Sequence, residues 1–250
     1  MKRALISDIH GNFAALSAVL DFIKTIEVDE IVCLGDIIGY GPDPLQCLDT
    51  VMECCNLTIL GNHDQAAIFD PEGFNPVAMR AIFWTREQLE KDTSERADRR
   101  WDFLGELPRQ HDEGQFLYVH GSPRDPTNEY VFPEHVYEKT RMESLMKRFD
   151  KFCFQGHTHI PGVFLSTGTF LQPNERDNFF ELKDEKCMIN VGSVGQPRDE
   201  DYRPCFAVQD TEAHTVQYHR VDYDAKGTCE KIHNIPDLDD MLGDRLLTGR

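Results

Sequence analysis

The stretch Leu57-Thr58-Ile59-Leu60-Gly61-Asn62-His63-Asp64 sets the interpretation of the whole chain. Its apolar, β-branched first half predicts a buried strand, and its polar second half follows that strand directly. Open α/β sheets build their ligand sites beyond the carboxyl ends of their strands. Asn supplies a neutral oxygen ligand, and His supplies a nitrogen ligand or an acid/base group. Gly-Asn is also a common turn dipeptide, so the stretch indicates a site only if other strand ends supply partners.

The first half of the chain alternates between strand and helix patterns. Strands are predicted at 3–7, 30–34 and 57–60, and helices at 12–26, 44–55, 76–90 and 94–106. Asn12 is a candidate N-cap of the first helix, whose apolar residues have helical spacing. Trp84 and Trp101 are predicted to pack against other helices. The strand-helix-strand-helix-strand order at the N-terminus predicts right-handed crossovers within a parallel sheet.

From Gln115 onward the pattern becomes rich in strands separated by Gly, Pro, Asn and Asp. Strands are predicted at 116–119, 152–154, 163–166, 169–171, 179–182, 187–190, 205–209 and 215–220, and helices at 133–149, 222–234 and 236–247. The two halves together predict an α/β fold of four layers, α/β/β/α, in which two mixed sheets pack face to face between flanking helices. We expect a single domain over residues 1–250.

The composition limits the classes of function. The chain of 250 residues has a formal net charge of -18, which argues against electrostatic binding of long nucleic acids or of an anionic membrane. A phosphate substrate is not excluded, because bound cations reverse the local charge. No apolar run is long enough to span a bilayer, and the N-terminal residues form no signal-peptide core, so we expect a cytoplasmic protein. The oligomeric state has no signal in the sequence.

Eight cysteines are scattered along the chain, several of them within apolar strand-like runs. None of them forms a repeated Cys-x-x-Cys frame. They are therefore expected to be reduced, buried core thiols, and not a disulfide scaffold or a zinc site.

Residues of the types that bind metals follow five of the predicted strands, next to glycines. They are Asp8, His10, Asp36, Asn62, His63, His120, His157 and His159. Glycine lets the backbone turn sharply and approach a ligand closely. Asp8 and His10 are two residues apart, so on an extended chain their side chains point the same way and can bind one ion. His157 and His159 share that spacing, although in a turn they could bind neighbouring ions instead.

These side chains form a mixed oxygen and nitrogen donor set, which suits Mn²⁺, Fe, Zn²⁺ or Ni²⁺ better than Ca²⁺ or Mg²⁺ alone. Even without His63, seven ligands are too many for one tetrahedral site. A centre of two divalent metal ions, with one carboxylate bridging ions about 3.5–4 Å apart, accommodates them and leaves room for water and substrate. Asp36 could alternatively be only a cap and Ser193 only a turn residue. Surface or core positions are predicted for His111, His135, His214, His219 and His233.

As an ordered set, these motifs resemble those of the calcineurin-like metallophosphoesterases. The motifs are Asp8-x-His10, Gly35-Asp36, Gly61-Asn62-His63-Asp64, His120 after a strand, and Gly156-His157-Thr158-His159. The surroundings of Asp8 and His120 and the segment 190–198 are similar to the compact bacterial and archaeal phosphoesterases of this family. The motifs extend to about residue 160, and the strand-rich remainder fits the two-sheet sandwich of the family.

The resemblance implies a role for each residue. One metal would be held by Asp8, His10 and His159, the other by Asn62, His120 and His157, and Asp36 would bridge them. His63 would stay unbound near the leaving-group oxygen, and Asp64 would orient His63 or a ligand. A metal-bridging hydroxide would attack phosphorus in line, and His63 as imidazolium would protonate the leaving group or stabilise its charge.

One departure from a related branch bears on the substrate. Ser/Thr protein phosphatases continue after the Gly-Asp motif with Asp-Arg-Gly, whose Arg binds phosphate, whereas this chain has Gly39-Tyr40-Gly41. Arg198 and Arg124 are the candidates for that role here, because guanidinium groups match phosphate oxygens. Arg198 could equally form a surface ion pair with Asp199 or Glu200.

The sequence therefore predicts a dinuclear metal-dependent phosphohydrolase that acts on small phosphomonoesters, phosphodiesters or nucleotides, including dinucleoside polyphosphates. The alternatives are a Ser/Thr-type protein phosphatase and a catalytically silent metal-binding scaffold. Loops such as 70–76 and 124–134 would select the substrate, since they carry aromatic and acidic residues without a recognisable code. Tyr40, Tyr130 and Phe132 could stack a base or serve packing alone.

Overall fold

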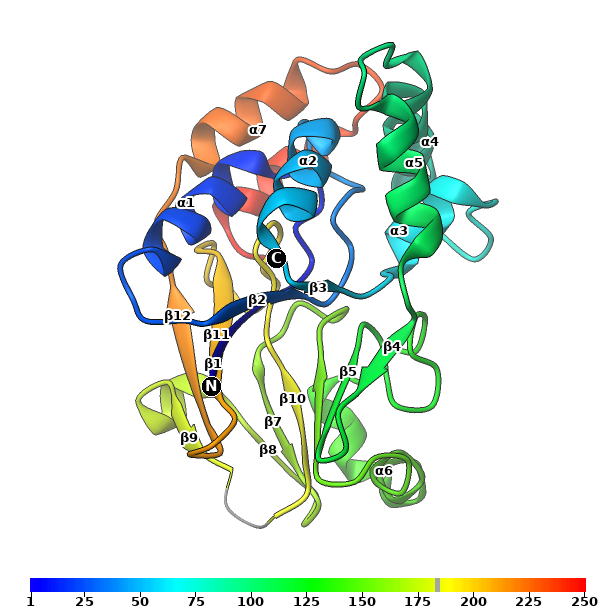
Figure 1. Ribbon diagram of the computed structural model, residues 1–250. Coiled ribbons are helices and arrows are strands. Elements are labelled where there is room, and N and C mark those ends of the chain that lie inside the picture. The colour runs from blue at the N-terminus through cyan, green and yellow to red at the C-terminus, as the bar shows by residue number, and fades with distance from the viewer. Residues whose placement is uncertain (183–184) are drawn as a thin grey trace.

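In the computed structural model, which describes residues 1–182 and 185–250, two mixed sheets pack face to face between outer helices (Figure 1). The first sheet has the strand order β3 (Leu57–Thr58), β2 (Glu30–Cys33), β1 (Lys2–Ile6), β11 (Cys205–Asp210), β12 (Thr215–Arg220) and β9 (Phe179–Glu181). The second has the order β4 (Gln110–Asp112), β5 (Phe116–Val119), β6 (Phe152–Gln155), β10 (Cys187–Asn190), β7 (Gly162–Leu165) and β8 (Thr169–Leu171).

The strands that precede the polar motifs run parallel to one another. β1 pairs with β2 and β2 with β3 in parallel, and in the second sheet β5 and β10 both run parallel to β6. Parallel strands end at the same edge of a sheet, so their carboxyl ends meet. The parallel sheet expected over the first three strands is confirmed, and antiparallel strands complete both sheets.

The helices lie outside the two sheets. They are α1 (Phe13–Ile23), α2 (Pro44–Cys54), α3 (Asn62–Ile68), α4 (Pro76–Lys91), α5 (Ala97–Glu106), α6 (Lys139–Met146), α7 (Ala225–His233) and α8 (Asp240–Asp244), with 3-10 turns at Pro133–Tyr137, Pro173–Arg176 and Arg245–Leu247. Asn12 caps α1 as expected, because its side chain accepts a hydrogen bond of 3.1 Å from the Ala15 amide.

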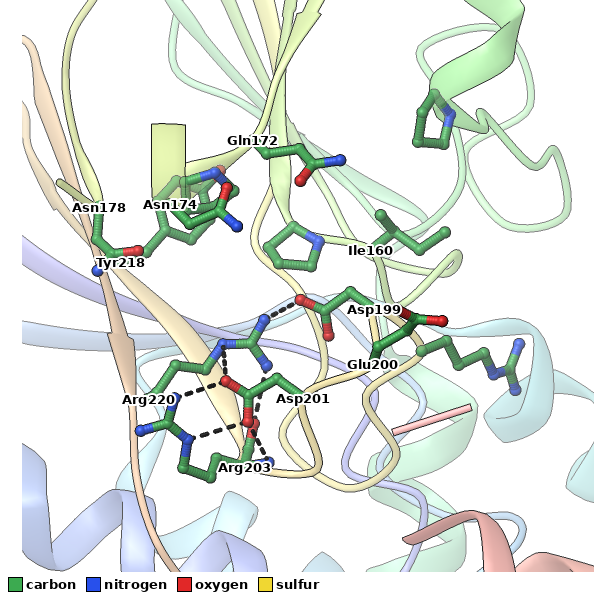
Figure 2. Close-up of a pocket in the computed structure, with 14 residues that line it drawn as sticks. Ile160, Gln172, Asn174, Asn178, Asp199, Glu200, Asp201, Arg203, Tyr218 and Arg220 are labelled. Atoms are coloured by element: carbon green, nitrogen blue, oxygen red, sulfur yellow. Dashed lines mark hydrogen bonds and ion pairs between the residues drawn. The ribbon is translucent and has the colours of Figure 1, made fainter. Parts of the chain in front are cut away.

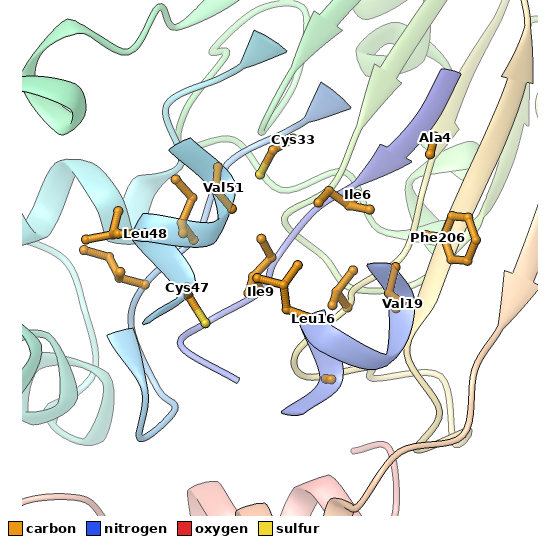
Figure 3. Packing of buried hydrophobic residues seen from close by; sticks show 14 of the residues in the cluster. Ala4, Ile6, Ile9, Leu16, Val19, Cys33, Cys47, Leu48, Val51 and Phe206 are labelled. Carbon is orange, nitrogen blue, oxygen red and sulfur yellow. The ribbon is translucent and has the colours of Figure 1, made fainter. Parts of the chain in front are cut away.

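The alternation of side chains along β1 divides the core into layers. Ile6 packs with Leu16 of α1 and Val51 of α2 on the outer face of the first sheet (Figure 3), whereas Leu5 belongs to the apolar cluster between the two sheets. The burial of both faces explains why this strand is apolar throughout.

The second sheet repeats this division. Phe152 and Phe154 of β6 are fully buried in the cluster between the sheets, while Cys153 points outward and packs with Leu145 of α6. The order of layers from α1 and α2 through both sheets to α6 is α/β/β/α, which confirms the predicted fold class.

Some predicted boundaries are wrong for local reasons. The helix expected over 133–149 is a 3-10 turn followed by α6, because Glu138 between them leaves the helical region at φ -91°, ψ 70°. The last predicted helix, 236–247, is shortened because Asp239 caps α8 by accepting from the Met241 amide. Residues 62–64, expected in a loop, form the first turn of α3. The polar edge strand β4 lacks apolar alternation and was not anticipated.

All eight cysteines lie in the described residues and are free thiols. Cys33, Cys47, Cys153, Cys187, Cys205 and Cys229 are buried, as predicted for core positions. No helix among the described residues is long and apolar enough to cross a bilayer. The cytoplasmic address and the single domain stay predictions.

Replacement of Phe154 should destabilise the interface between the sheets. Phe154→Ala removes a fully buried ring, so we expect the free energy of unfolding to fall by about 3–5 kcal/mol. The control is Phe179→Ala, since Phe179 on the edge strand β9 is 42% exposed and its loss should cost less than about 1.5 kcal/mol. Urea denaturation followed by circular dichroism measures both; equal losses would contradict the assigned core.

Candidate metal centre

The seven side chains predicted as metal ligands come together at the shared carboxyl edge of the two sheets. The first sheet supplies four, Asp8 and His10 after β1, Asp36 after β2 and Asn62 after β3, and the second sheet supplies three, His120 after β5 and His157 and His159 after β6. Each has at most 7% of its surface exposed.

Four donor atoms form a first group. The Nε2 atoms of His10 and His159 are 3.1 Å apart. Asp8 Oδ1 lies 3.3 Å from His159 Nε2 and 3.9 Å from His10 Nε2, and Asp36 Oδ2 lies 3.6 Å from His10 Nε2. Neighbouring ligands around an ion with bonds of about 2.1 Å are separated by roughly 3.0–3.4 Å. The separations of 3.1 and 3.3 Å, which join His159 to His10 and to Asp8, fall within this range.

The same oxygen of Asp36 belongs to a second group. Asp36 Oδ2 lies 3.4 Å from His120 Nε2. His120 Nε2 in turn lies 3.1 Å from Asn62 Oδ1 and 3.0 Å from His157 Nδ1. Asp36 Oδ2 is thus close to donor atoms of both groups.

Backbone carbonyl groups orient the four histidine rings of these groups. The pairs are His10 Nδ1 with Ile38 O at 3.3 Å, His120 Nδ1 with Leu34 O at 2.8 Å, His159 Nδ1 with Gln196 O at 2.6 Å, and His157 Nε2 with Asn128 O at 3.1 Å. Only an N–H donates to a carbonyl, so each ring in its neutral form presents the lone pair of its other nitrogen to the cluster. Burial lowers the pKa values of His10 and His159, and the lone pairs of these two neutral rings, 3.1 Å apart, repel unless a cation lies between them. The donor set fits divalent ions.

The backbone at these ligands is unusual. Five of the seven have positive φ: Asp8 at 53°, His10 at 50°, Asp36 at 54°, His157 at 67° and His159 at 61°. Residues with a Cβ adopt this region at a cost of about 1–2 kcal/mol each. Such residues cluster at functional sites, where the surrounding structure holds them in place. Their concentration at one edge indicates a backbone shaped for the site.

The two carboxylates are held as acceptors by main-chain amides. Asp8 Oδ2 accepts from the His157 amide at 3.0 Å, and Asp36 Oδ1 accepts from the His63 amide at 2.8 Å. Burial acts to raise the pKa of Asp36, but His120 and His63 hold that pKa well below its usual range. Burial likewise acts to lower the pKa of His120, but Asp36 raises it to about 9, so without an ion this ring carries a proton that metal binding would displace. Both effects keep the Asp36 carboxylate ionised.

His63 lies beside the ligands but is held differently. Its ring centre is 4.8 Å from that of His10, 4.5 Å from that of Tyr40 and 5.0 Å from that of Phe74. Its buried Nδ1 has no hydrogen-bond partner within residues 1–182 and 185–250. A ring nitrogen comes within 4.8 Å of donor atoms of His10 and Asp36, so distance alone does not separate His63 from the ligands. What distinguishes His63 from the ligand histidines is that its Nδ1 contacts no backbone carbonyl within the described residues.

Burial also affects the protonation of His63. Burial lowers its pKa to about 4; Asp36 opposes this effect and Arg198 adds to it. Without a ligand beside it the ring therefore favours the neutral imidazole, and its expected role as imidazolium toward the leaving group stays a prediction. An anionic phosphate bound beside the ring would favour its protonated form.

Asp64 contacts the backbone. Its Oδ1 accepts from the amides of Ile37 at 2.9 Å and Ile38 at 3.2 Å, and its Oδ2 accepts from that of Gly61 at 3.2 Å. The carboxylate therefore fastens the loop after β2 to the first turn of α3. It thereby supports the loop that carries Asp36, in keeping with the expected role of orienting a ligand, and a contact with the His63 ring, the other expected role, is not among those of the described residues.

Arg198 lies beside the centre. Its guanidinium carbon is 5.9 Å from the Tyr40 ring centre. The pKa values of His63 and His159 are lowered by burial and also by the charge of Arg198. Its Nη2 donates to Gln196 Oε1 at 2.9 Å, and its buried Nε has no partner within the described residues. This N–H therefore has an unmet hydrogen-bonding capacity within the described residues.

The acidic neighbours of Arg198 have other partners. Asp199 forms an ion pair with Arg220 in the cavity shown in Figure 2. Glu200 pairs with Arg250 at 2.9 Å. Within the described parts of the chain, the surface ion pair considered for Arg198 is therefore not formed.

Arg124, the other candidate, is engaged elsewhere. Its guanidinium forms an ion pair with Glu129, and 38% of its side chain is exposed. Glu129 also accepts from Arg141 Nη2 at 3.1 Å. These contacts hold the loop after β5 and favour Arg198 as the phosphate-binding residue.

The remaining histidines lie outside the two groups. His111 contacts Glu113 at 3.0 Å, in keeping with a surface position. His233 lies 3.5 Å from Cys229 Sγ and 3.1 Å from Asp244 Oδ1, a contact between α7 and α8 that the sequence did not suggest.

The sequence interpretation missed several residues that position the ligands. Asn190 donates to Gly156 O at 2.6 Å and to Thr158 Oγ1 at 2.9 Å, which fixes the turn carrying His157 and His159. Ser193, considered only as a turn residue, donates to Asp8 O at 2.8 Å. The sequence contains a signal for these two residues, because they are polar side chains within the otherwise apolar run 187–194. The carbonyl groups that orient the histidines leave no signal, because every residue has one.

Comparisons with known proteins agree with this geometry. The family model of the calcineurin-like phosphoesterase superfamily domain matches residues 1–214. An uncharacterized protein of Methanocaldococcus jannaschii is 34% identical over 99% of this chain and 98% of its own length. The crystal structure of a metallophosphoesterase from Sphaerobacter thermophilus superposes with a TM-score of 0.85 at 34% identity, covering 100% of this chain and 99% of that one. The symmetrical bis(5'-nucleosyl)-tetraphosphatase of Erwinia tasmaniensis is 39% identical over only 26% of this chain and 24% of its own.

Gly61 should be indispensable to the centre. A Cβ at this position would lie 2.1 Å from Asp36 Oδ1, so Gly61→Ala should displace Asp36, destabilise the fold by about 2–4 kcal/mol and reduce bound metal. Gly105 in α5 is the matched control, since a Cβ there meets nothing within 4 Å. Gly105→Ala should be neutral or stabilising by about 0.5–1 kcal/mol. Metal content by mass spectrometry and urea denaturation measure both; full metal content in Gly61→Ala would contradict the assignment.

Proposed function

Since the chain belongs to the calcineurin-like phosphoesterase superfamily and is a phosphoesterase, we propose that it is a dinuclear metal-dependent phosphohydrolase. Its substrates would be small phosphomonoesters, phosphodiesters or nucleotides. The partial likeness to a bis(5'-nucleosyl)-tetraphosphatase supports nucleotides as one candidate class.

The position of Asp36 is the observation that carries the proposal. Its Oδ2 is 3.6 Å from His10 Nε2 in one group of donors and 3.4 Å from His120 Nε2 in the other. A carboxylate shared by two donor groups is the arrangement that a two-metal site requires.

The residues divide between two ions in this proposal. One ion would be held by Asp8, His10 and His159, and the other by Asn62, His120 and His157, with Asp36 shared. Bound ions of this kind supply positive charge for the phosphate oxygens and lower the pKa of water toward about 7, which provides a hydroxide nucleophile for in-line attack. The mixed donor set fits Mn, Fe, Zn or Ni.

The chain's own groups bind the substrate and serve its leaving group. Arg198, with an unpaired buried Nε, is the proposed clamp for a phosphate oxygen. It lies against Tyr40, within the Gly39-Tyr40-Gly41 segment that replaces the Asp-Arg-Gly of protein phosphatases. His63 lacks the carbonyl contact that orients the ligand histidines, which supports its role as the group beside the leaving oxygen. Protonation of His63 would accompany substrate binding, because burial lowers its pKa to about 4 in the free protein.

Two alternatives have less support. The scaffold alternative is disfavoured because all seven expected ligands converge and are buried. The protein phosphatase alternative is disfavoured because Tyr40 stands in the segment where that branch has its phosphate-binding arginine.

Asp36→Asn tests the shared carboxylate. The amide retains the shape but removes the negative charge between the donor groups, so we expect metal content to fall below two ions per chain and kcat/KM to fall by about 10³-fold. The assay is hydrolysis of a chromogenic monoester and diester with Mn²⁺, together with metal analysis. Full activity in Asp36→Asn, or no activity of the unmodified protein with any divalent metal, would refute the proposal.

A second pair of variants separates the roles within the Gly61-Asn62-His63-Asp64 turn. Asn62→Ala removes a proposed ligand and should lower the occupancy of one metal. His63→Ala should spare both metals while lowering kcat by about 10²–10⁴-fold, the usual contribution of a proton donor. Metal analysis and kinetics are measured on the same preparations. Equal metal loss in the two variants would show that His63 is itself a ligand.

A further inference from the structure

A cavity of about 560 Å³ adjoins the metal centre. The proposed ligand Asn62 is part of its lining. Asn128, whose carbonyl orients His157, and Tyr130, whose ring stacks on that of His157 at 3.7 Å, line it as well. A substrate held at the metals can therefore extend into this cavity.

The cavity lies on the side of His63. Tyr40 and Phe74 line it, and the rings of both contact the His63 ring, at 4.5 Å and 5.0 Å between centres. On the proposed function, His63 stands beside the departing oxygen. The part of the substrate attached to that oxygen then occupies this cavity.

The charged side chains that line the cavity are all acidic. Asp70 and Glu72, both exposed, line it, and none of its lining residues in the described chain is a Lys or an Arg. Arg86 contacts the same segment, but its guanidinium hydrogen-bonds to main-chain carbonyls, including those of Ala66 and Ala67, and does not line the cavity. An anionic group placed here meets two carboxylates and no lysine or arginine of the lining.

The cavity of Figure 2 differs in its charged residues. It has about 580 Å³ and is lined by Arg198, Arg203 and Arg220 as well as by three acidic residues, two of which are paired with these arginines. Its basic and acidic lining residues are thus equal in number, whereas the charged lining residues of the first cavity are all acidic.

Aromatic surface in the first cavity is available to a ligand. Phe69 is 61% exposed and Tyr130 is 39% exposed, and both line the cavity together with Tyr40 and Phe74. Large exposed aromatic side chains at a concave site supply apolar contact to a ligand, and their faces attract cations.

We propose that this cavity is the leaving-group site and that it selects phosphate esters of uncharged or cationic alcohols that carry an aromatic or apolar group. Water adds to phosphorus, the bond from phosphorus to the alcohol oxygen breaks, and that oxygen keeps the electron pair and takes a proton, so the products are the phosphate and the free alcohol. A nucleoside is an alcohol of the selected class. A nucleoside polyphosphate is disfavoured as the departing group, because its phosphates would face Asp70 and Glu72.

The test uses three aryl phosphates of matched shape, each as a monoester and as a methyl diester. Their para substituents are neopentyl, trimethylammoniomethyl and sulfonatomethyl, and each enzymatic rate is divided by the uncatalysed rate. With the Mn²⁺-loaded protein we expect kcat/KM for the sulfonate to be about 10-fold below that for the neopentyl ester, and the cationic ester to equal or exceed the neutral one. Cleavage of the sulfonate within 2-fold of the neutral ester, on the order of experimental error, would overturn the proposal.

Two charge-matched double variants locate the effect. Asp70→Asn with Glu72→Gln should bring the sulfonate-to-neopentyl ratio close to one. Asp21→Asn with Glu27→Gln makes the same change in net charge at exposed positions away from the cavity and should keep the wild-type ratio. An unchanged ratio in the first variant, or an equal change in both, would overturn the cavity as the origin of the selectivity.

A binding measurement separates this proposal from the proposed function. Saturation-transfer NMR with the three parent phenols and the Zn²⁺-loaded protein should detect the neutral and cationic phenols, and the sulfonate only weakly. If no ester is hydrolysed, the phosphohydrolase proposal fails, and the phenols still decide whether the cavity discriminates by charge. Equal binding of all three phenols would overturn the cavity proposal alone.

Discussion

The Asp36 carboxylate is the interaction on which the rest of the site depends, because its two oxygens have different tasks. Oδ1 accepts the His63 amide at 2.8 Å and thereby fixes the start of α3, while Oδ2 faces donors of both groups. Burying this charge is costly unless donors or cations surround it. The absence of a side chain at Gly61 leaves room for the carboxylate, and Asp64 holds the adjoining loop through three amides.

Much of this site could be predicted because polar residues at the ends of apolar strands stand out in a sequence. Asp8, Asp36 and His120 were placed correctly at strand ends for this reason. The start of α3 could not be placed, since Gly-Asn favours a turn and the first turn of the helix is fixed by the tertiary contact between the His63 amide and Asp36. The break at Glu138 has no local signal, because helical propensity continues across it. The main-chain carbonyls that orient the histidines are equally invisible in a sequence.

The backbone at the proposed ligands adopts a conformation that costs folding stability. Residues such as Asp8 and His159 hold left-handed backbone that a glycine would adopt more easily. The packing between the sheets, where Phe152 and Phe154 are fully buried, contributes stability that offsets this cost. Hydrogen bonds from Asn190 and Ser193 to the backbone of the turns that carry the proposed ligands also offset it. The backbone of the site is thus held in place by residues outside the donor set.

The division of the ligands between the two sheets has a consequence for biosynthesis. Asp8 and His10 leave the ribosome well before their partner His159, and the carbonyl that orients His159 belongs to Gln196. The nascent chain therefore exposes unpaired carboxylates and imidazoles until the segment through Gln196 has emerged. Because β10 lies between β6 and β7 and β11 lies beside β1, both sheets at the centre also need strands that follow His159 in the chain.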